Sequence, residues 1–147
     1  MRPLEGLFVL DFSTLLPGPL ATLLLAEAGA EVVKIERPGS GEEMRGRTPK
    51  WGTDSANFAL LNRGKRSVAI DLKNTAERAR LQPLVERADV IVEQFRPGVM
   101  ARFGLDYDAV AKVNPTVITA QFQDMGKPAL SAAWPHTTST ISAMRVS

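Results

Sequence analysis

Two basic side chains follow predicted buried strands directly and could bind phosphate. Arg37 follows the apolar run at residues 31–36, and Lys73 comes two residues after the run at residues 67–71. Open α/β sheets bind ligands beyond the carboxyl ends of their strands, where guanidinium and ammonium groups suit a nucleotide with several phosphates. On these residues alone, solvated loop charge is the simpler interpretation.

The other reactive side chains form no catalytic or metal-binding pattern. His136 is the only histidine, and the chain has no cysteine, so disulfides and thiolate metal sites are excluded. Asp11 and Asp71 end predicted strands, where most such carboxylates cap the next turn. The phosphate fingerprint G-x-G-x-x-G is absent, and the first turn instead carries Leu-Pro-Gly-Pro at residues 16–19. Because proline has no N–H group to offer a pyrophosphate, NAD binding is not expected.

Alternating strand and helix patterns position these residues. Strands are expected at residues 7–11, 31–36, 67–71, 89–93 and 116–120, and helices at residues 20–28, 75–88 and 107–113, with shorter ones near 55–61 and before 103. The first strand, helix and strand form a βαβ unit, whose right-handed crossover makes the strands parallel. We therefore predict a Rossmann-like open, mostly parallel α/β sheet flanked by helices. Pro19 is expected at the first helical position, Pro83 at a kink or new turn, and Asp106 at a helix cap.

Composition limits the classes of partner. The 147 residues are 44% hydrophobic, which suits one domain with its own core. A net charge of +2 is too balanced for a nucleic-acid-binding surface. No signal-peptide pattern is present, and the most apolar window, residues 20–28, is too short to span a bilayer. A cytoplasmic protein without a membrane or nucleic-acid partner is expected.

Four ordered blocks together resemble one protein family. They lie at residues 11–19, 25–36, 62–73 and 88–105, and include Leu-Ala-Glu-Ala-Gly-Ala-Glu-Val-Val-Lys-Ile-Glu, Asn-Arg-Gly-Lys-Arg-Ser and Ala-Asp-Val-Ile-Val-Glu-Gln-Phe-Arg-Pro-Gly. In this order they are similar to the N-terminal portion of the family III CoA-transferases (CaiB/BaiF), which include formyl-CoA transferase and α-methylacyl-CoA racemase. The resemblance covers about residues 4–120 and implies that coenzyme A lies against the Rossmann-like domain.

The resemblance assigns eight residues to the coenzyme A site and leaves the chain without assigned catalytic or metal-binding residues. They are Leu16 and Pro17 in the first turn, Arg37 at the nucleotide, Ile70 and Lys73 beside the adenine and phosphates, Gln94 and Phe95 at the family's Asn-Phe pair, and Arg102 at the phosphates. Coenzyme A or an acyl-CoA is implied as a substrate, with no permanently bound cofactor. Glutamine replaces the family's asparagine at position 94.

The implied reaction moves CoA between carboxylic acids through an aspartyl-CoA thioester, which is covalent catalysis by a carboxylate. An α-methylacyl-CoA racemase-like enzyme, exchanging a proton through a histidine and an aspartate, is the alternative. Either catalytic set would lie beyond Gln121, so the chain is expected to be a truncated, inactive form of an enzyme. A non-catalytic CoA-binding module or an unstable pseudogene product also stays open. Full-length members resemble interlocked homodimers, an assembly that we do not extend to this chain alone.

The alternating pattern stops near Gln121. We expect a CoA-binding domain at residues 1–121 and an irregular tail at residues 122–147. If each tail codon is shifted by one base, codon degeneracy permits S-G-Y-G-Q-x-G-P and H-D-I-N-Y, two segments typical of family members. A single-base frameshift near Gln121 or Phe122 is therefore our hypothesis, and it would leave His136 without a role.

Overall fold

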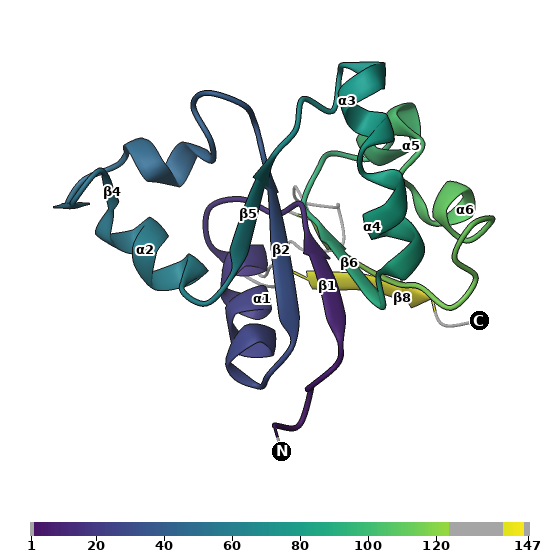
Figure 1. Ribbon diagram of the computed structural model, residues 1–147, viewed down its shortest axis with the longest axis horizontal. Coiled ribbons are helices and arrows are strands. Elements are labelled where there is room, and N and C mark those ends of the chain that lie inside the picture. Colours follow the sequence, from purple (N-terminus) through teal and green to yellow (C-terminus); the bar gives the residue numbers. More distant parts are fainter. Residues whose placement is uncertain (1, 124–139, 146–147) are drawn as a thin grey trace, which may run out of the picture.

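A six-stranded sheet forms the centre of the protein in a computed structural model, which describes residues 2–123 and 140–145 (Figure 1). Its strands lie in the order β5-β2-β1-β6-β7-β8. Their bounds are β1 Phe8–Asp11, β2 Glu31–Glu36, β5 Arg66–Ala69, β6 Val90–Glu93, β7 Ile118–Gln123 and β8 Thr140–Arg145. The first five strands in this order are parallel, and β8 is antiparallel to β7. The predicted Rossmann-like α/β fold is confirmed.

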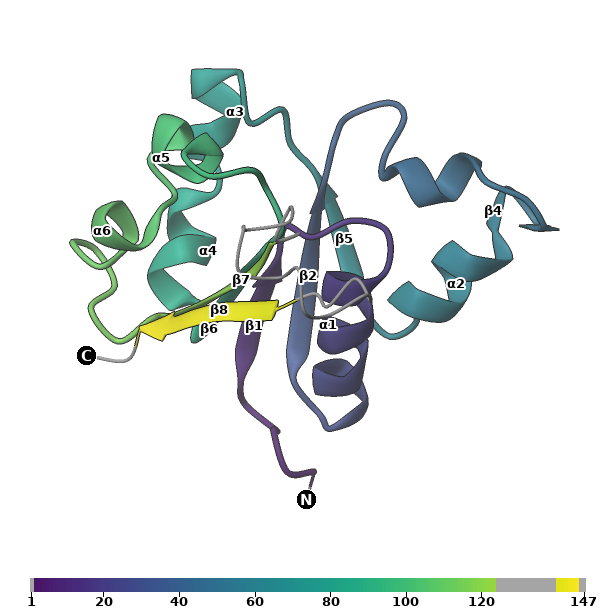
Figure 2. The ribbon, with the colours of Figure 1, turned by 180° about the vertical axis from the view of Figure 1, so that it is seen from behind.

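Helices cover both faces of the sheet. Their bounds are α1 Pro17–Glu27, α2 Ala56–Asn62, α3 Thr75–Ala79, α4 Gln82–Arg87, α5 Val99–Phe103 and α6 Tyr107–Val110. Helix α1 lies on the face seen in Figure 2, and α4 lies on the face seen in Figure 1. Helix α2, the short helix η1 (Glu43–Gly46) and the hairpin β3 (Lys50–Trp51) and β4 (Asp54–Ser55) extend to one side (Figure 1). Within the described ranges, no helix is long and apolar enough to cross a membrane.

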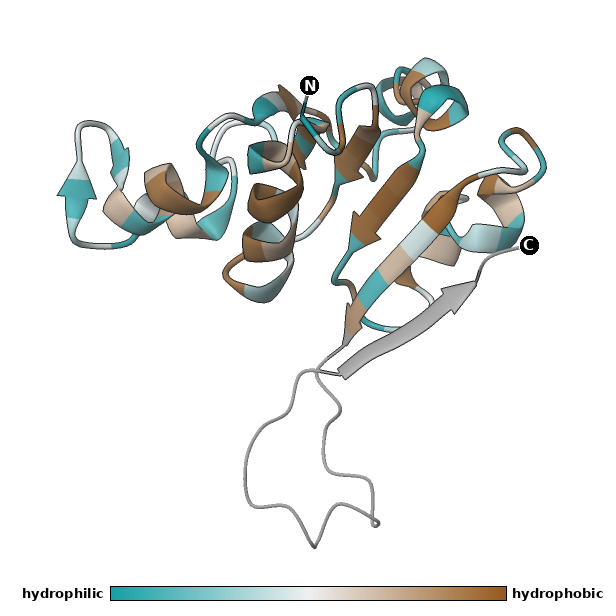
Figure 3. Ribbon diagram, turned by 90° about the horizontal axis from the view of Figure 1, so that it is seen from below, coloured by the Kyte–Doolittle hydropathy of each residue, from teal (hydrophilic) through white to brown (hydrophobic). Residues whose placement is uncertain are grey.

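The core divides between the two faces because neighbouring strand residues point in opposite directions. On β1, Phe8 and Leu10 join the larger cluster with Leu81 and Val85. Val9 joins a smaller cluster on the α1 face. Both faces are covered, so β1 and β6 begin with runs of three consecutive hydrophobic residues rather than an alternating pattern (Figure 3).

Three helix boundaries differ in detail from the prediction. Helix α1 begins at Pro17, before the predicted Pro19, because a proline without an N–H group suits any position of the first turn. The predicted helix at residues 75–88 is divided into α3 and α4, and Pro83 lies in the first turn of α4, as expected. Asp106 precedes α6, but its side chain makes no capping hydrogen bond. At the end of another helix, α4, the Asn114 side chain donates to the carbonyls of Val85 at 2.9 Å and Ala88 at 2.7 Å.

The last described strand lies in the segment expected to be irregular. Residues 140–145 form β8, which pairs with the outer edge of β7. Backbone pairing with a free strand edge requires little side-chain periodicity, which explains why the sequence pattern did not predict β8. The rest of the predicted tail beyond residue 123 and His136 lie outside the described residues.

Candidate functional site

The strand order creates a crevice beyond β1 and β6. From β1 the chain proceeds to β2 and then β5 on one side, and it returns to β6 on the other side of β1. The connections after β1 and β6 therefore leave in opposite directions. Such a switch point is where open α/β sheets bind ligands. The segment after Asp11 and the segment after Glu93 form its two walls.

Gly18 brings these two walls together. A Cβ atom at Gly18 would overlap the Ser13 side chain and would lie 3.1 Å from Gln94 Oε1. The Gln94 amide therefore faces the first turn across the switch point. Its Oε1 atom is buried and has no hydrogen-bond partner within the described part of the chain. A buried carbonyl without a donor is costly, so a ligand N–H or O–H group would be favoured here.

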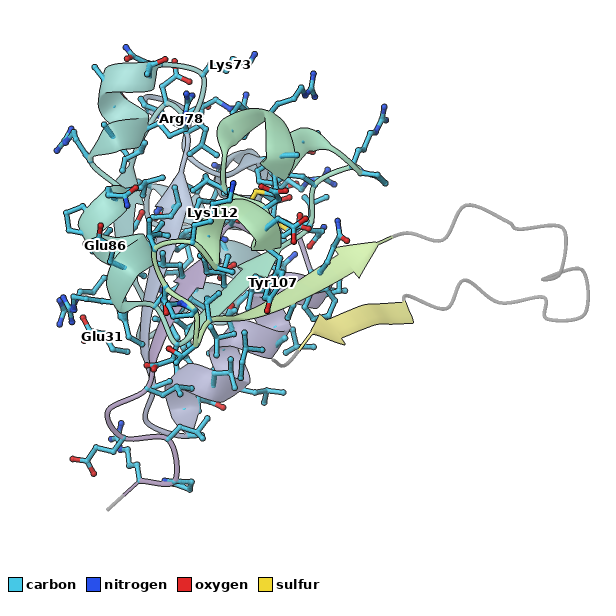
Figure 4. All side chains as sticks on the ribbon, turned by 90° about the vertical axis from the view of Figure 1, so that its right-hand side faces the viewer. Glu31, Lys73, Arg78, Glu86, Tyr107 and Lys112 are labelled. Atoms are coloured by element: carbon cyan, nitrogen blue, oxygen red, sulfur yellow. The ribbon has the colours of Figure 1, made fainter. Side chains whose placement is uncertain are left out.

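Three predicted cations lie exposed along the carboxyl edge of the sheet. Arg37 follows β2, Lys73 lies between β5 and α3, and Arg102 lies in α5 after β6. Figure 4 shows Lys73 at the end of the molecule opposite Glu31, which begins β2. Leu16 precedes α1 with 56% of its surface exposed. The topology thus places the predicted phosphate-binding groups at one edge.

Two predicted apolar residues contact the larger core cluster. Ile70 follows β5 and is only 3% exposed, because its side chain belongs to the larger core cluster. Phe95 is half-buried and packs against the same cluster. The Ile70 side chain therefore lies in the core and not at the surface.

A polar groove of about 490 Å³ opens beyond β2 and β5. Arg37 lines it together with Gly39, Ser40, Lys50 and Arg45. Arg45 is engaged elsewhere: its guanidinium lies 3.8 Å from the centre of the Phe58 ring. Arg37, by contrast, is exposed, and its side chain is accessible in this groove.

Glu36 at the end of β2 holds Arg45 in place. Arg45 donates from Nε and Nη2 to the two carboxylate oxygens of Glu36, both at 2.7 Å, and from Nη1 to Asp54 at 3.0 Å. Burial alone would raise the pKa of Glu36, but hydrogen bonds from Arg45, Ser67 and a backbone N–H lower it to about 2. The Glu36 hydrogen bonds in turn raise the pKa of Arg45. This pair fixes the base of the groove.

A second cavity, of about 380 Å³, lies beside Glu93. Burial raises the pKa of Glu93, while hydrogen bonds from the Phe95 N–H and the Gln121 side chain oppose that rise. Met100 and Tyr107 also line this cavity. None of the eight predicted residues lines it in the described structure.

The sequence analysis missed a buried ionic cluster behind the first turn. Its members are Asp11, Lys34, Glu42 and Lys65, from four separate parts of the chain. Lys34, between Val33 and Ile35 in a predicted buried strand, was the available signal, because lysine is almost never fully buried without a partner. Asp11 also caps the turn that follows it, as expected, by accepting from the Ser13 N–H at 2.9 Å. Within the described residues, no group of three or more His, Asp or Glu side chains could hold a metal ion.

The fold and the switch point define a Rossmann-like α/β domain. The chain matches the model of CoA-transferase family III over residues 4–145 and belongs to this family. The match extends past residue 120, where the resemblance was expected to end. The frameshift hypothesis remains a prediction, and sequencing the DNA around codon 121 tests it.

The curated relatives are named as CoA-transferases. The chain is 40% identical over 142 residues to acetyl-CoA:oxalate CoA-transferase of Acetobacter aceti, covering 97% of this chain and 36% of that protein. It is 42% identical over 128 residues to formyl-CoA:oxalate CoA-transferase of Rhodopseudomonas palustris (strain TIE-1), covering 85% of this chain and 30% of that protein. The chain thus spans about a third of the length of these relatives.

Solved structures share the fold. A CaiB/BaiF family protein from Brucella suis is 32% identical with a TM-score of 0.79, covering 90% of this chain and 36% of that one. The protein Rv3272 from Mycobacterium tuberculosis is 33% identical with a TM-score of 0.78, covering 96% of this chain and 45% of that one. Both similarities agree with a chain that corresponds to part of a longer family member.

Proposed function

We propose that the chain forms the coenzyme-A-binding part of a CoA-transferase that moves CoA between carboxylic acids. The observation that carries this proposal is the alignment of Arg37, Lys73 and Arg102 along one edge of the sheet, on both sides of the switch point. Coenzyme A carries phosphates at its nucleotide end, and exposed cations there would bind them.

The neutral part of the ligand would cross the first turn. Leu16 offers an exposed apolar side chain, and Pro17 follows it as the first residue of α1. The unpartnered Gln94 Oε1 would accept a hydrogen bond from an amide N–H of the ligand. Ile70 and Phe95 would support this surface from the core.

The names of the curated relatives favour a transferase over a racemase. Both relatives described above are oxalate CoA-transferases, one using acetyl-CoA and one using formyl-CoA. We therefore propose a short acyl-CoA and a small carboxylic acid such as oxalate as substrates of the whole enzyme. The nucleophilic carboxylate would lie outside residues 2–123, and a cytoplasmic location would suit these substrates.

Isothermal titration calorimetry with coenzyme A tests the site. Arg37→Ala and Lys73→Ala are each expected to weaken binding by about tenfold, the usual value of a charge-assisted hydrogen bond. Arg66→Ala is the matched control. Arg66 begins β5 at the opposite edge of the sheet, where it pairs with Glu31 at 3.2 Å.

The outcomes separate the claims. Equal weakening by all three substitutions would mean that only net charge matters. Coenzyme A binding that Arg37→Ala and Lys73→Ala leave unchanged would place the ligand elsewhere. Failure of the unmodified chain to bind coenzyme A would contradict the proposal itself.

A further inference from the structure

Four ionic side chains lie buried together behind the first turn. Asp11, Lys34, Glu42 and Lys65 each expose at most 1% of the side chain. Lys34 Nζ lies 2.7 Å from Glu42 Oε2 and 3.8 Å from Asp11 Oδ2, and Lys65 Nζ lies 3.2 Å from Asp11 Oδ2. The cluster therefore pairs two ammonium groups with two carboxylates.

Stability alone does not account for such a cluster. Removing four ions from water is costly, and apolar residues of similar volume often stabilise a core equally well. Burial lowers the pKa of Lys65 even though Asp11 opposes the change. Loss of water therefore disfavours the charged form of this lysine. The backbone groups that the four side chains contact indicate a more specific role.

Two members of the cluster hold the middle of the first turn. The Leu15 N–H donates to Glu42 Oε1 at 2.7 Å, and Lys34 Nζ donates to the Ser13 carbonyl at 2.7 Å. These contacts replace the backbone pairing that a strand or helix would supply. The turn is thus held by side chains from β2 and from the loop after it.

The other two members hold the ends of the same turn. Lys65 Nζ donates to the Pro19 carbonyl at 2.9 Å and to Thr22 Oγ1 at 2.7 Å. Asp11 accepts from the Ser13 N–H at 2.9 Å and from Thr22 Oγ1 at 2.6 Å. All four ionic side chains therefore bond to backbone groups between residues 13 and 19.

Leu15 explains why the turn requires this support. Its φ of 64° lies in the left-handed region, which costs a residue with a Cβ atom about 1–2 kcal/mol. The charge-assisted bond from its N–H to Glu42 offsets that cost. The conformation of Leu15 sets the direction of Leu16, whose side chain is exposed at the switch point.

We propose that the buried cluster of Asp11, Lys34, Glu42 and Lys65 positions the turn at residues 13–19 to receive coenzyme A, with Glu42 holding Leu15 in its left-handed conformation. This proposal rests on the coenzyme A site proposed above. The four side chains are positioning residues, because they act through the backbone of the turn and not by contact with the ligand.

The variant Lys34→Met/Glu42→Leu separates positioning from stability. It removes one positive and one negative charge, so Asp11 and Lys65 remain paired, and the apolar replacements are expected to offset enough of the lost bonding for the variant to stay folded. It also removes the bonds to the Leu15 N–H and the Ser13 carbonyl. Calorimetry is expected to show coenzyme A binding about tenfold weaker than in the unmodified chain.

The control and the rescue use neighbouring residues. Glu43→Leu/Arg47→Met likewise replaces one acidic and one basic residue, at an exposed ion pair, and is expected to leave binding unchanged. Adding Leu15→Gly to the buried double variant is expected to restore affinity to within about threefold, because glycine adopts positive φ without cost. A purely structural cluster would not respond to this third substitution.

Each outcome bears on one claim. A folded double variant with unchanged affinity overturns the positioning role alone. If the double variant does not fold, Glu42→Gln provides the test: weaker coenzyme A binding that Leu15→Gly reverses supports the role, and unchanged binding overturns it. Absence of coenzyme A binding by the unmodified chain overturns the proposed function, and this inference with it.

Discussion

Replacing Glu36 by glutamine removes one negative charge from a buried carboxylate at the end of β2. Glu36 is 6% exposed and accepts hydrogen bonds from Arg45 Nε and Nη2, both at 2.7 Å. It also accepts from Ser67 Oγ at 2.5 Å and from the Glu42 N–H at 2.9 Å. Glutamine keeps the shape of the side chain but cannot accept from all four donors. The substitution therefore removes the charge together with the hydrogen bonds that need the second carboxylate oxygen, while it keeps the size of the side chain.

The lowered pKa of Glu36 gives the magnitude. Burial opposes the change, but the hydrogen bonds lower that pKa from 4.5 to about 2. The difference corresponds to about 3 kcal/mol of folding free energy at neutral pH. Because this pKa is lower in the folded state, the stabilisation is present above about pH 4.5 and is lost as the pH falls towards about 2.

Urea denaturation followed by circular dichroism between pH 7 and pH 2 measures this contribution. The unmodified chain is expected to exceed Glu36→Gln by about 3 kcal/mol at pH 7, with the two curves converging near pH 2. Glu43→Gln, at an exposed carboxylate seven residues along, is the control and is expected to show a small, nearly constant difference. Parallel pH curves for the unmodified chain and Glu36→Gln would refute the reasoning.

Three further substitutions test packing, a helix end and a buried carboxylate by the same unfolding measurement. Gly18→Ala is expected to lower the free energy of unfolding by about 1–3 kcal/mol, because the new methyl group overlaps Ser13. The control Gly46→Ala places its methyl group in open space and is expected to be nearly neutral. Equal effects of the two substitutions would argue against close packing at the turn. Asn114→Ala is expected to lower the free energy of unfolding by about 2 kcal/mol, because two buried carbonyls at the end of α4 lose their donor. An unchanged free energy of unfolding would mean that these carbonyls find other partners. Burial raises the pKa of Glu93, so the folded state disfavours its ionised form. Glu93→Gln is therefore expected to be more stable than the unmodified chain by a larger margin at pH 8 than at pH 5. A larger margin at pH 5 would contradict the raised pKa.

The sheet was predictable because each central strand is a short apolar run followed by turn residues. The sequence predicts strands ending at Asp11, Glu36 and Glu93, and β1, β2 and β6 end at these residues. Position along an edge also follows from topology, so Arg37 and Lys73 could be assigned to the carboxyl edge. The exact start of α1 could not, since Pro17 and Pro19 both suit a first helical turn.

The buried charges were not predictable, because they depend on contacts between distant parts of the chain. Lys34 and Glu42 are ion-paired only because the loop after β2 folds back over the first turn. The resemblance assigns Ile70 to the coenzyme A site, and the structure places its side chain in the larger core cluster, directly after β5. Edge position can be inferred from sequence, whereas the direction of a side chain requires the packed structure.

The most direct test of the account is to map coenzyme A onto the ¹⁵N-labelled chain by amide chemical-shift changes. Saturable shifts are expected at the carboxyl edge and the switch point, at Ser13, Gly18, Arg37, Lys73 and Gln94. Amides at the opposite edge of the sheet are expected to remain unchanged. Shifts confined to the cavity beside Glu93 or to the opposite edge, or no shifts at all, would contradict the claim that coenzyme A binds across the ends of β1 and β6.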